Sequence, residues 1–173
     1  MNPLLVAGPN YTAPMWQNFF MAAAGASAAL AGLVFVALSV NITRILQVPH
    51  LPSRAGATIG TLILILVCSM AELIAQPAFA LGMEILAFAA CGWILKAWAA
   101  YRAITDGRRM QRPPFEAVVE TVLGQIQVLP FIAGGVLLAR GDGAGFYWVA
   151  AGVFSVFIFS VFNSWVLLVE ILR

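Results

Sequence analysis

The sequence predicts an all-α integral membrane protein, a bundle of five transmembrane helices with the N-terminus outside and the C-terminus in the cytoplasm. Hydrophobic residues make up 62% of the chain and charged residues 9%, whereas about a quarter of the residues of soluble proteins are charged. Basic residues near the ends of spans stay cytoplasmic. Of the nine basic residues, all but Arg140 lie in or beside every second connection between the apolar stretches, which places those connections on the same side of the membrane. These eight residues are Arg44, Arg54, Lys96, Arg102, Arg108, Arg109, Arg112 and Arg173.

The first span is predicted over residues 18–43, a stretch that contains no charged side chain. It is longer than the ~30 Å hydrocarbon core requires, so we expect it to tilt or to project from the bilayer. Arg44 closes it, and the prolines at 49 and 52 prevent the helix from continuing. The second span follows over residues 55–75.

The remaining spans are separated by equally clear breaks. Gln76-Pro77 predicts a tight outer turn into a third span over 78–101, and the longest polar stretch, 102–116, follows it. The fourth span is predicted over 117–139 and the fifth over 146–172, so residues 1–173 form a single transmembrane domain. If the second and third spans do not cross completely, they would form re-entrant helices.

Small residues recur at helical spacing along the first span. They are Ala22, Gly25, Ala29, Gly32 and Ser39. Small residues spaced by three and four let two helix backbones approach closely in lipid, so this face is predicted to be a helix-packing seam. Its partner is either within the same chain or on another copy or another protein. Gly134, Gly135 and Gly152 are candidates for receiving it within the chain.

Polar residues in the fourth span raise a functional hypothesis, because ionisable groups in a bilayer are expensive. Glu116, Glu120 and Gln127 share one helical face, and Pro130 frees a backbone carbonyl that could serve Gln127 as a partner. One interpretation is the polar lining of a cytoplasm-facing vestibule. The alternative places Glu116 and Glu120 in the first turns of the helix, where its dipole and nearby arginines stabilise them.

Other polar groups lie in the second, third and fifth spans. The tight turn would bring Glu72 and Glu84 close together, to share a proton or bind a cation, unless both reach outward into water. Asn163 and Glu170 share a face of the fifth span, where Asn163 is expected to donate an interhelical hydrogen bond. Lys96 is expected to extend to the cytoplasmic headgroups.

The sequence contains no group of residues whose types and spacing indicate a catalytic or metal site. The single histidine, His50, lies in a predicted loop, so an axial haem pair or a histidine-containing metal site within the membrane is not expected. Cys68 and Cys91 fall in apolar segments and are expected to be free thiols. We therefore predict no cofactor, no metal and no enzyme activity. The absence of a basic stripe argues against nucleic-acid binding.

The first and last spans resemble a known group of proteins. The stretches Trp16-Gln-Asn-Phe-Phe, Ala24–Asn41 and Asn163–Ile171 are similar to those of small bacterial polytopic membrane proteins. Some of these are labelled modulators of the membrane-bound AAA protease FtsH. The resemblance implies a bacterial, non-enzymatic protein.

Two functions are compatible with these observations. The first is a non-enzymatic accessory or regulatory subunit of the bacterial inner membrane, which contacts other membrane helices, of its own kind or of a larger complex, through the seam. The second is a homo-oligomeric cation or proton channel, or a small transporter, lined by Glu120 and Gln127 with Glu72 and Glu84 at its outer mouth.

Overall fold

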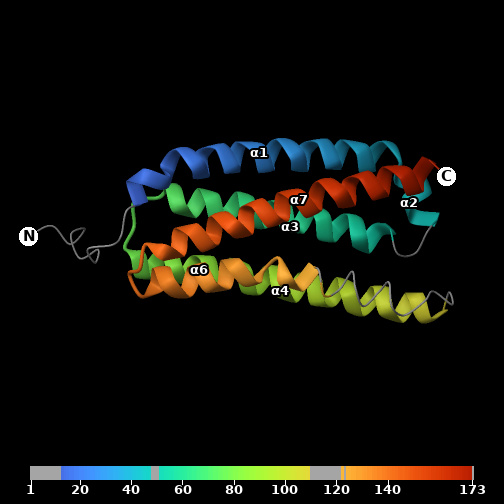
Figure 1. Ribbon diagram of the computed structural model, residues 1–173. Coiled ribbons are helices and arrows are strands. Elements are labelled where there is room, and N and C mark those ends of the chain that lie inside the picture. Colours follow the sequence, from blue (N-terminus) through green and yellow to red (C-terminus); the bar gives the residue numbers. More distant parts are fainter. Residues whose placement is uncertain (1–12, 48–50, 110–121, 123, 173) are drawn as a thin grey trace, which may run out of the picture.

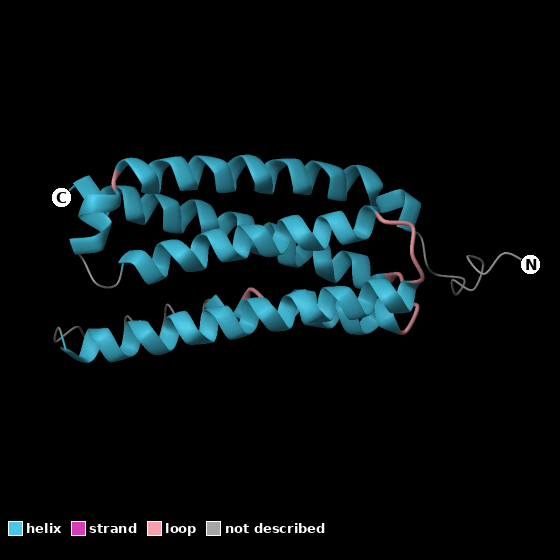
Figure 2. Cartoon of the chain, turned by 180° about the vertical axis from the view of Figure 1, so that it is seen from behind, coloured by secondary structure: helices cyan, strands magenta, loops and turns pink. Residues whose placement is uncertain are grey.

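The structure, a computed structural model, describes residues 13–47, 51–109, 122 and 124–172, and every regular element among them is a helix. The helices lie roughly side by side in an elongated bundle, with the two sides of the molecule seen in Figures 1 and 2. Their bounds are α1 Ala13–Val40, α2 Ile42–Gln47, α3 Leu51–Leu73, α4 Ala78–Arg109, α6 Leu129–Ala139 and α7 Ala144–Leu172.

Four of these helices are long and apolar enough to cross a membrane. The stretches that qualify are Met15–Val40, Ala55–Leu73, Ala78–Trp98 and Ala144–Trp165. They correspond to the predicted first, second, third and fifth spans. Where the fourth span was predicted, the described residues contain a shorter apolar helix, Gly124–Ala139, and part of residues 117–123 lies outside the description.

The helix ends follow from local chemistry. Pro52 occurs in the first turn of α3, where the missing N–H costs nothing. The predicted Gln76-Pro77 turn is confirmed, and the Leu81 N–H already donates to the Pro77 carbonyl oxygen at 3.1 Å. Gly141 ends α6 with a φ of 78°, a conformation that only glycine adopts at little cost. α4 continues beyond its predicted end at residue 101 to Arg109.

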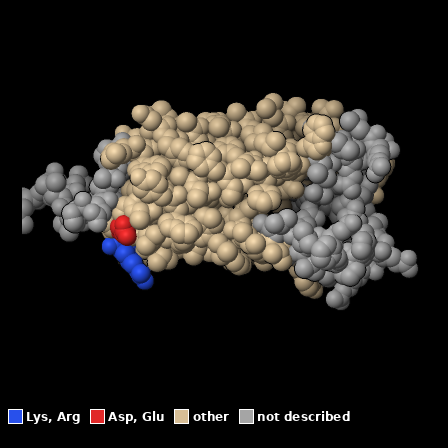
Figure 3. All heavy atoms as spheres, viewed as in Figure 1, with Lys and Arg blue, Asp and Glu red and all other residues tan. Residues whose placement is uncertain are grey.

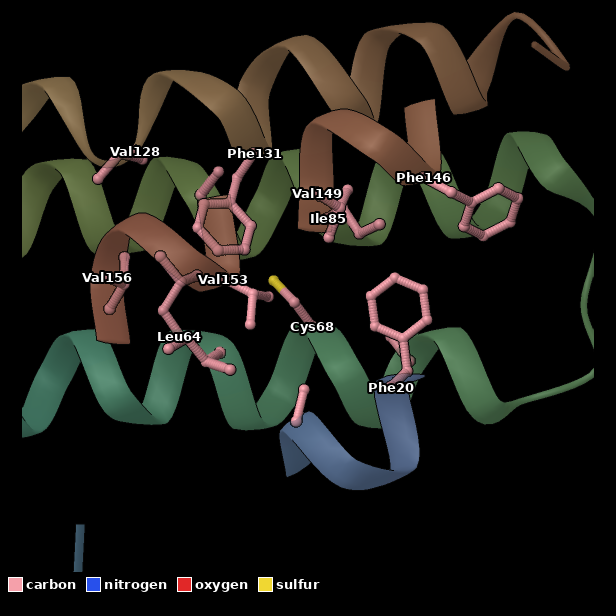
Figure 4. Close-up of a cluster of buried hydrophobic side chains, with 14 of the residues drawn as sticks. Phe20, Leu64, Cys68, Ile85, Val128, Phe131, Phe146, Val149, Val153 and Val156 are labelled. Carbon is pink, nitrogen blue, oxygen red and sulfur yellow. The ribbon is translucent and has the colours of Figure 1, made fainter. Parts of the chain in front are cut away.

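α3 is the central helix of the bundle. It packs against α1, α4 and α7, while α6 lies between α4 and α7. Side chains from these helices meet in one apolar core, shown in Figure 4, where Cys68 and Leu64 of α3 lie among residues of the other helices. Ile85, Phe131 and Val149 are fully buried there. Charged atoms on the described part of the face in Figure 3 occur only at the end where α6 and α7 connect.

Glycines bring α6 against both of its neighbours. A Cβ atom added at Gly82 of α4 would come within 2.6 Å of the Gly135 carbonyl oxygen, and one added at Gly145 of α7 would come equally close to that of Gly134. These obstacles are backbone atoms, which cannot rotate away. Close backbone approach is how helices associate in lipid, where burial of apolar surface provides no drive.

These contacts correct one expectation from the sequence. Gly134, Gly135 and Gly152 do not receive the small-residue seam of α1. Gly134 faces Val149 of α7, Gly135 faces Leu86 of α4, and an added Cβ at Gly152 would lie 2.7 Å from the ring of Phe131. All three glycines lie in the contacts of the short helix α6 with α4 and α7, where the absence of a side chain permits close approach.

We expect Gly82→Ala and Gly145→Ala each to lower the free energy of unfolding by about 1–3 kcal/mol, since overpacking forces the backbones apart. The measurement is unfolding of the reconstituted protein by a graded denaturing detergent. Gly25→Ala is the matched control, because nothing lies within 4 Å of an added Cβ there. Equal stability of all three variants would contradict the close packing.

Candidate functional site

The small-residue seam of α1 faces away from the bundle. Its five residues, Ala22, Gly25, Ala29, Gly32 and Ser39, are all exposed. The buried side of α1 carries Phe20, Ala23, Ser27 and Val34 instead. At about 3.6 residues per turn, the two sets lie about 180° apart around the helix axis. The seam is therefore free of contacts with the rest of the described chain at its glycines, where an added Cβ would meet nothing within 4 Å.

Aromatic contacts near the N-terminal end of α1 hold the helix in this rotation. The indole of Trp16 stacks on Phe146 of α7 with ring centroids 6.0 Å apart, and meets Tyr147 edge-on at 4.7 Å. Phe20 is buried beneath them and tilts against Phe146 at 6.2 Å. Such pairs add about 0.5–1.5 kcal/mol each beyond their burial. A rotation that turned the seam inward would break all three contacts.

At its C-terminal end, near Ser39, the seam borders an apolar pocket of about 440 Å³. Phe35 and Ser39 of α1, Ile45 of α2, and Pro52 and Ile59 of α3 contribute to its wall. The Ser39 hydroxyl donates to the Phe35 carbonyl oxygen at 2.8 Å, so its hydrogen is already used. The pocket therefore suits hydrocarbon better than a polar ligand.

A second candidate site lies just before α6, where residues 127–128 form a turn that interrupts the helix. The Lys96 ammonium of α4 donates to the Gly124 carbonyl oxygen at 2.8 Å and to the Gln127 side-chain oxygen at 3.0 Å. Gln127 is buried and Lys96 is half-buried. The expectation that Lys96 extends to the headgroups is wrong, because the interrupted helix offers it two acceptors inside the bundle.

The interruption has a local cause. The Val128 N–H donates to the Gln125 carbonyl oxygen at 3.1 Å, a bond spanning three residues instead of four, and Pro130 has no N–H to donate. Because the Val128 N–H is used in this way, the Gly124 carbonyl oxygen lacks its usual helical partner, whereas the missing N–H of Pro130 affects the carbonyl oxygen of Ile126. The sequence predicts that a carbonyl freed by Pro130 could serve Gln127 as a partner. The bond that the structure gives the Gln127 side-chain oxygen comes from Lys96, which also donates to the Gly124 carbonyl oxygen.

Glu72 and Glu84, the two carboxyl groups predicted to lie close together, are found in different environments. Glu84 accepts a hydrogen bond from the Gln76 side-chain amide at 2.8 Å and is half-buried. Glu72 is 5% exposed, and both of its oxygens lack a hydrogen-bond partner. Neither expected arrangement, a shared site or two outward carboxylates, describes Glu72. The Ser69 hydroxyl, one turn earlier on α3, is also buried without a partner.

The other predicted polar residues are only partly visible. Glu116 and Glu120 lie outside the described residues, and so does the side chain of Glu170, which belongs to α7. Asn163 is half-buried and is not left without a partner. Cys68 and Cys91 are free thiols, as expected. Among the residues described, no group of three histidine, cysteine or carboxylate side chains is placed to hold a metal ion.

Two residues that contribute to these sites, Ser69 and Lys96, differ in how clearly the sequence marks them. Ser69 is one of many small polar residues in the spans, and only its buried, unpartnered hydroxyl distinguishes it. Lys96 has a usable signal, because a lysine well inside an apolar stretch raises the question of which acceptor it meets.

Comparison of the chain with protein-family models, curated proteins and solved structures finds no match. The resemblance of the first and last spans to small bacterial membrane proteins therefore stays a prediction. Any function has to be argued from the geometry of the chain itself.

We expect Lys96→Met to destabilise the protein by about 1–3 kcal/mol, because it leaves two acceptors unpaired, one on the buried Gln127 and one on the half-buried Gly124. In the Lys96→Met/Gln127→Met double variant, one of those acceptors is removed as well. The double variant is therefore expected to lose less stability than the sum of the single variants. Additive losses in detergent-unfolding experiments would show that the Lys96–Gln127 bond contributes nothing.

Proposed function

We propose that this protein is a non-enzymatic accessory subunit of the bacterial inner membrane, which binds a helix of another membrane protein chain through α1. One observation carries the proposal: the small-residue seam of α1 points away from its own bundle. Gly25 and Gly32 would each admit a side chain without meeting any described atom of the same chain.

Lipid chemistry makes such a face suitable for association. Helices in a bilayer attract one another by close van der Waals packing, which small residues permit and large side chains prevent. The fold does not use the seam for its own stability, because Gly82, Gly134, Gly135 and Gly145 make the close contacts inside the bundle. A second helix can therefore occupy the seam without disturbing the fold.

The alternative of a cation channel has weaker support. The Gln127 side-chain oxygen, a proposed part of its lining, accepts a hydrogen bond from Lys96 of the same chain. In this conformation a positive charge occupies the place where a cation pathway would need an acceptor. Glu120, its other proposed residue, lies outside the described residues.

The proposal includes a topology of five spans, with the N-terminus outside the cytoplasm. Four apolar helices and the shorter one over Gly124–Ala139 would then cross the membrane in turn, with the basic connections inside. We expect alkaline phosphatase fused after Gly143 to be active outside the cytoplasm, and green fluorescent protein fused after Arg173 to fluoresce inside. An active phosphatase at position 173 would reverse the proposed orientation.

We expect Gly25→Leu/Gly32→Leu to weaken association about tenfold or more, because the added side chains hold the partner backbone away. Native mass spectrometry of the full chain, released from its own membrane in lipid nanodiscs, measures the fraction of protein in complex. The matched control is Ala26→Leu, an exposed alanine beside the seam.

The three proteins separate the possible explanations. Loss of the complex in the glycine double variant alone locates the interface on the seam. Equal loss in Ala26→Leu would point to a general effect of bulk on α1. A wild-type protein that is released only as single chains would contradict the proposed function.

A further inference from the structure

Glu72 is the most unusual polar residue among those described. It is 5% exposed, yet neither carboxyl oxygen has a hydrogen-bond partner. Ser69, three residues earlier on the same helix, is 0% exposed and its hydroxyl is equally without a partner. Residues three apart on a helix are neighbours on its surface. Two unsatisfied groups of complementary chemistry therefore lie within one turn of α3.

The surroundings of this pair are apolar. The same end of the core contains Phe20 of α1, Leu81 of α4, Leu138 of α6 and Phe146 of α7, all fully buried. The buried thiol of Cys68, a titratable group, lies one turn away on α3. An ionised carboxylate without a counter-charge is very expensive in such an environment.

None of the other charged side chains that the structure describes is a hydrogen-bond partner of Glu72. Glu84 is bound to Gln76, and the Lys96 ammonium is bound to Gly124 and Gln127. Arg140 is exposed, and Asp142 accepts a hydrogen bond from the Ala144 N–H in the loop between α6 and α7. The exposed Cys91 and Tyr147 point away from the core. No described cation therefore lies within hydrogen-bond distance of the Glu72 carboxyl oxygens to balance a charge there.

We propose that Ser69 and Glu72 form a proton-binding site in the outer half of the bundle, and that Glu72 carries the proton while it is buried. The bound proton makes Glu72 a neutral carboxylic acid, whose O–H can reach the Ser69 hydroxyl oxygen or a carbonyl oxygen of the preceding turn once the side chains rotate from the unbonded positions described here. The Ser69 O–H can then donate to the Glu72 carbonyl oxygen or to its own helix. One proton thus neutralises the charge and satisfies both groups.

A metal cation fits the pair less well than a proton. Sodium and similar ions need several oxygen ligands, and the site offers only the carboxyl group and one hydroxyl beyond backbone already bonded within the helix. Release of the proton would leave a buried anion, so the site can lose it only if the outer end of the bundle opens to water. The ring cluster of Trp16, Phe20 and Phe146 covers that end.

The test is infrared spectroscopy of the full chain in lipid bilayers at neutral pH, with isotope-labelled glutamate to identify glutamic acid carbonyl bands. We expect a protonated-glutamate band in the wild-type protein that disappears in Glu72→Gln. Ser69→Ala should keep the band and shift its frequency, because the carboxyl group loses a hydrogen-bond partner. Glu84→Gln is the matched control and should leave the band unchanged.

Two outcomes would overturn the proposal. The first is a wild-type spectrum without a protonated-glutamate band at neutral pH, a result that needs no variant and so does not depend on whether Glu72→Gln folds. The second is a band that persists in a folded Glu72→Gln protein, which would assign the proton to another glutamate. Neither result depends on whether the α1 seam binds a partner.

Discussion

The constraint that governs this structure is that a polar group in hydrocarbon has to find its partner within the protein. Helices satisfy their own backbone, and side-chain hydroxyls bond back to their own helices, as Ser27 does to the Ala24 carbonyl oxygen and Thr61 to that of Ala57. Where the chain breaks before α6, Lys96 supplies the missing donor. Glu72 stands out because this rule is not met there by any described residue.

Small residues serve two separate purposes in the bundle. Inside, Gly82, Gly135 and Gly145 let the short helix α6 touch the backbones of α4 and α7, which fixes the spacing of these helices. Outside, Gly25 and Gly32 leave the surface of α1 smooth and unoccupied. The aromatic contact of Trp16 with Phe146 determines which side of α1 faces inward, and Gly25 and Gly32 therefore stay on the outer surface.

The sequence predicts much of the fold and less of the candidate sites. Breaks at Pro52 and Gln76-Pro77 mark the helix ends well, because proline and short polar turns have strong local effects. The direction in which the seam faces is not predictable, since both sides of a membrane helix are apolar and periodicity shows only that residues share a side. The partner of Lys96 also escapes prediction, because it depends on a carbonyl freed some thirty residues away, at Gly124.

The positions of the two cysteines have a practical consequence. Cys68 is enclosed in the core, whereas Cys91 is exposed on α4, and α4 lies across the bundle from α1 (Figure 1). A thiol-reactive nitroxide would thus attach to the natural chain at one place, on the side remote from the seam. If two copies join through α1, their labels end up separated by the thickness of both bundles, while a dimer joined through α4 brings them together.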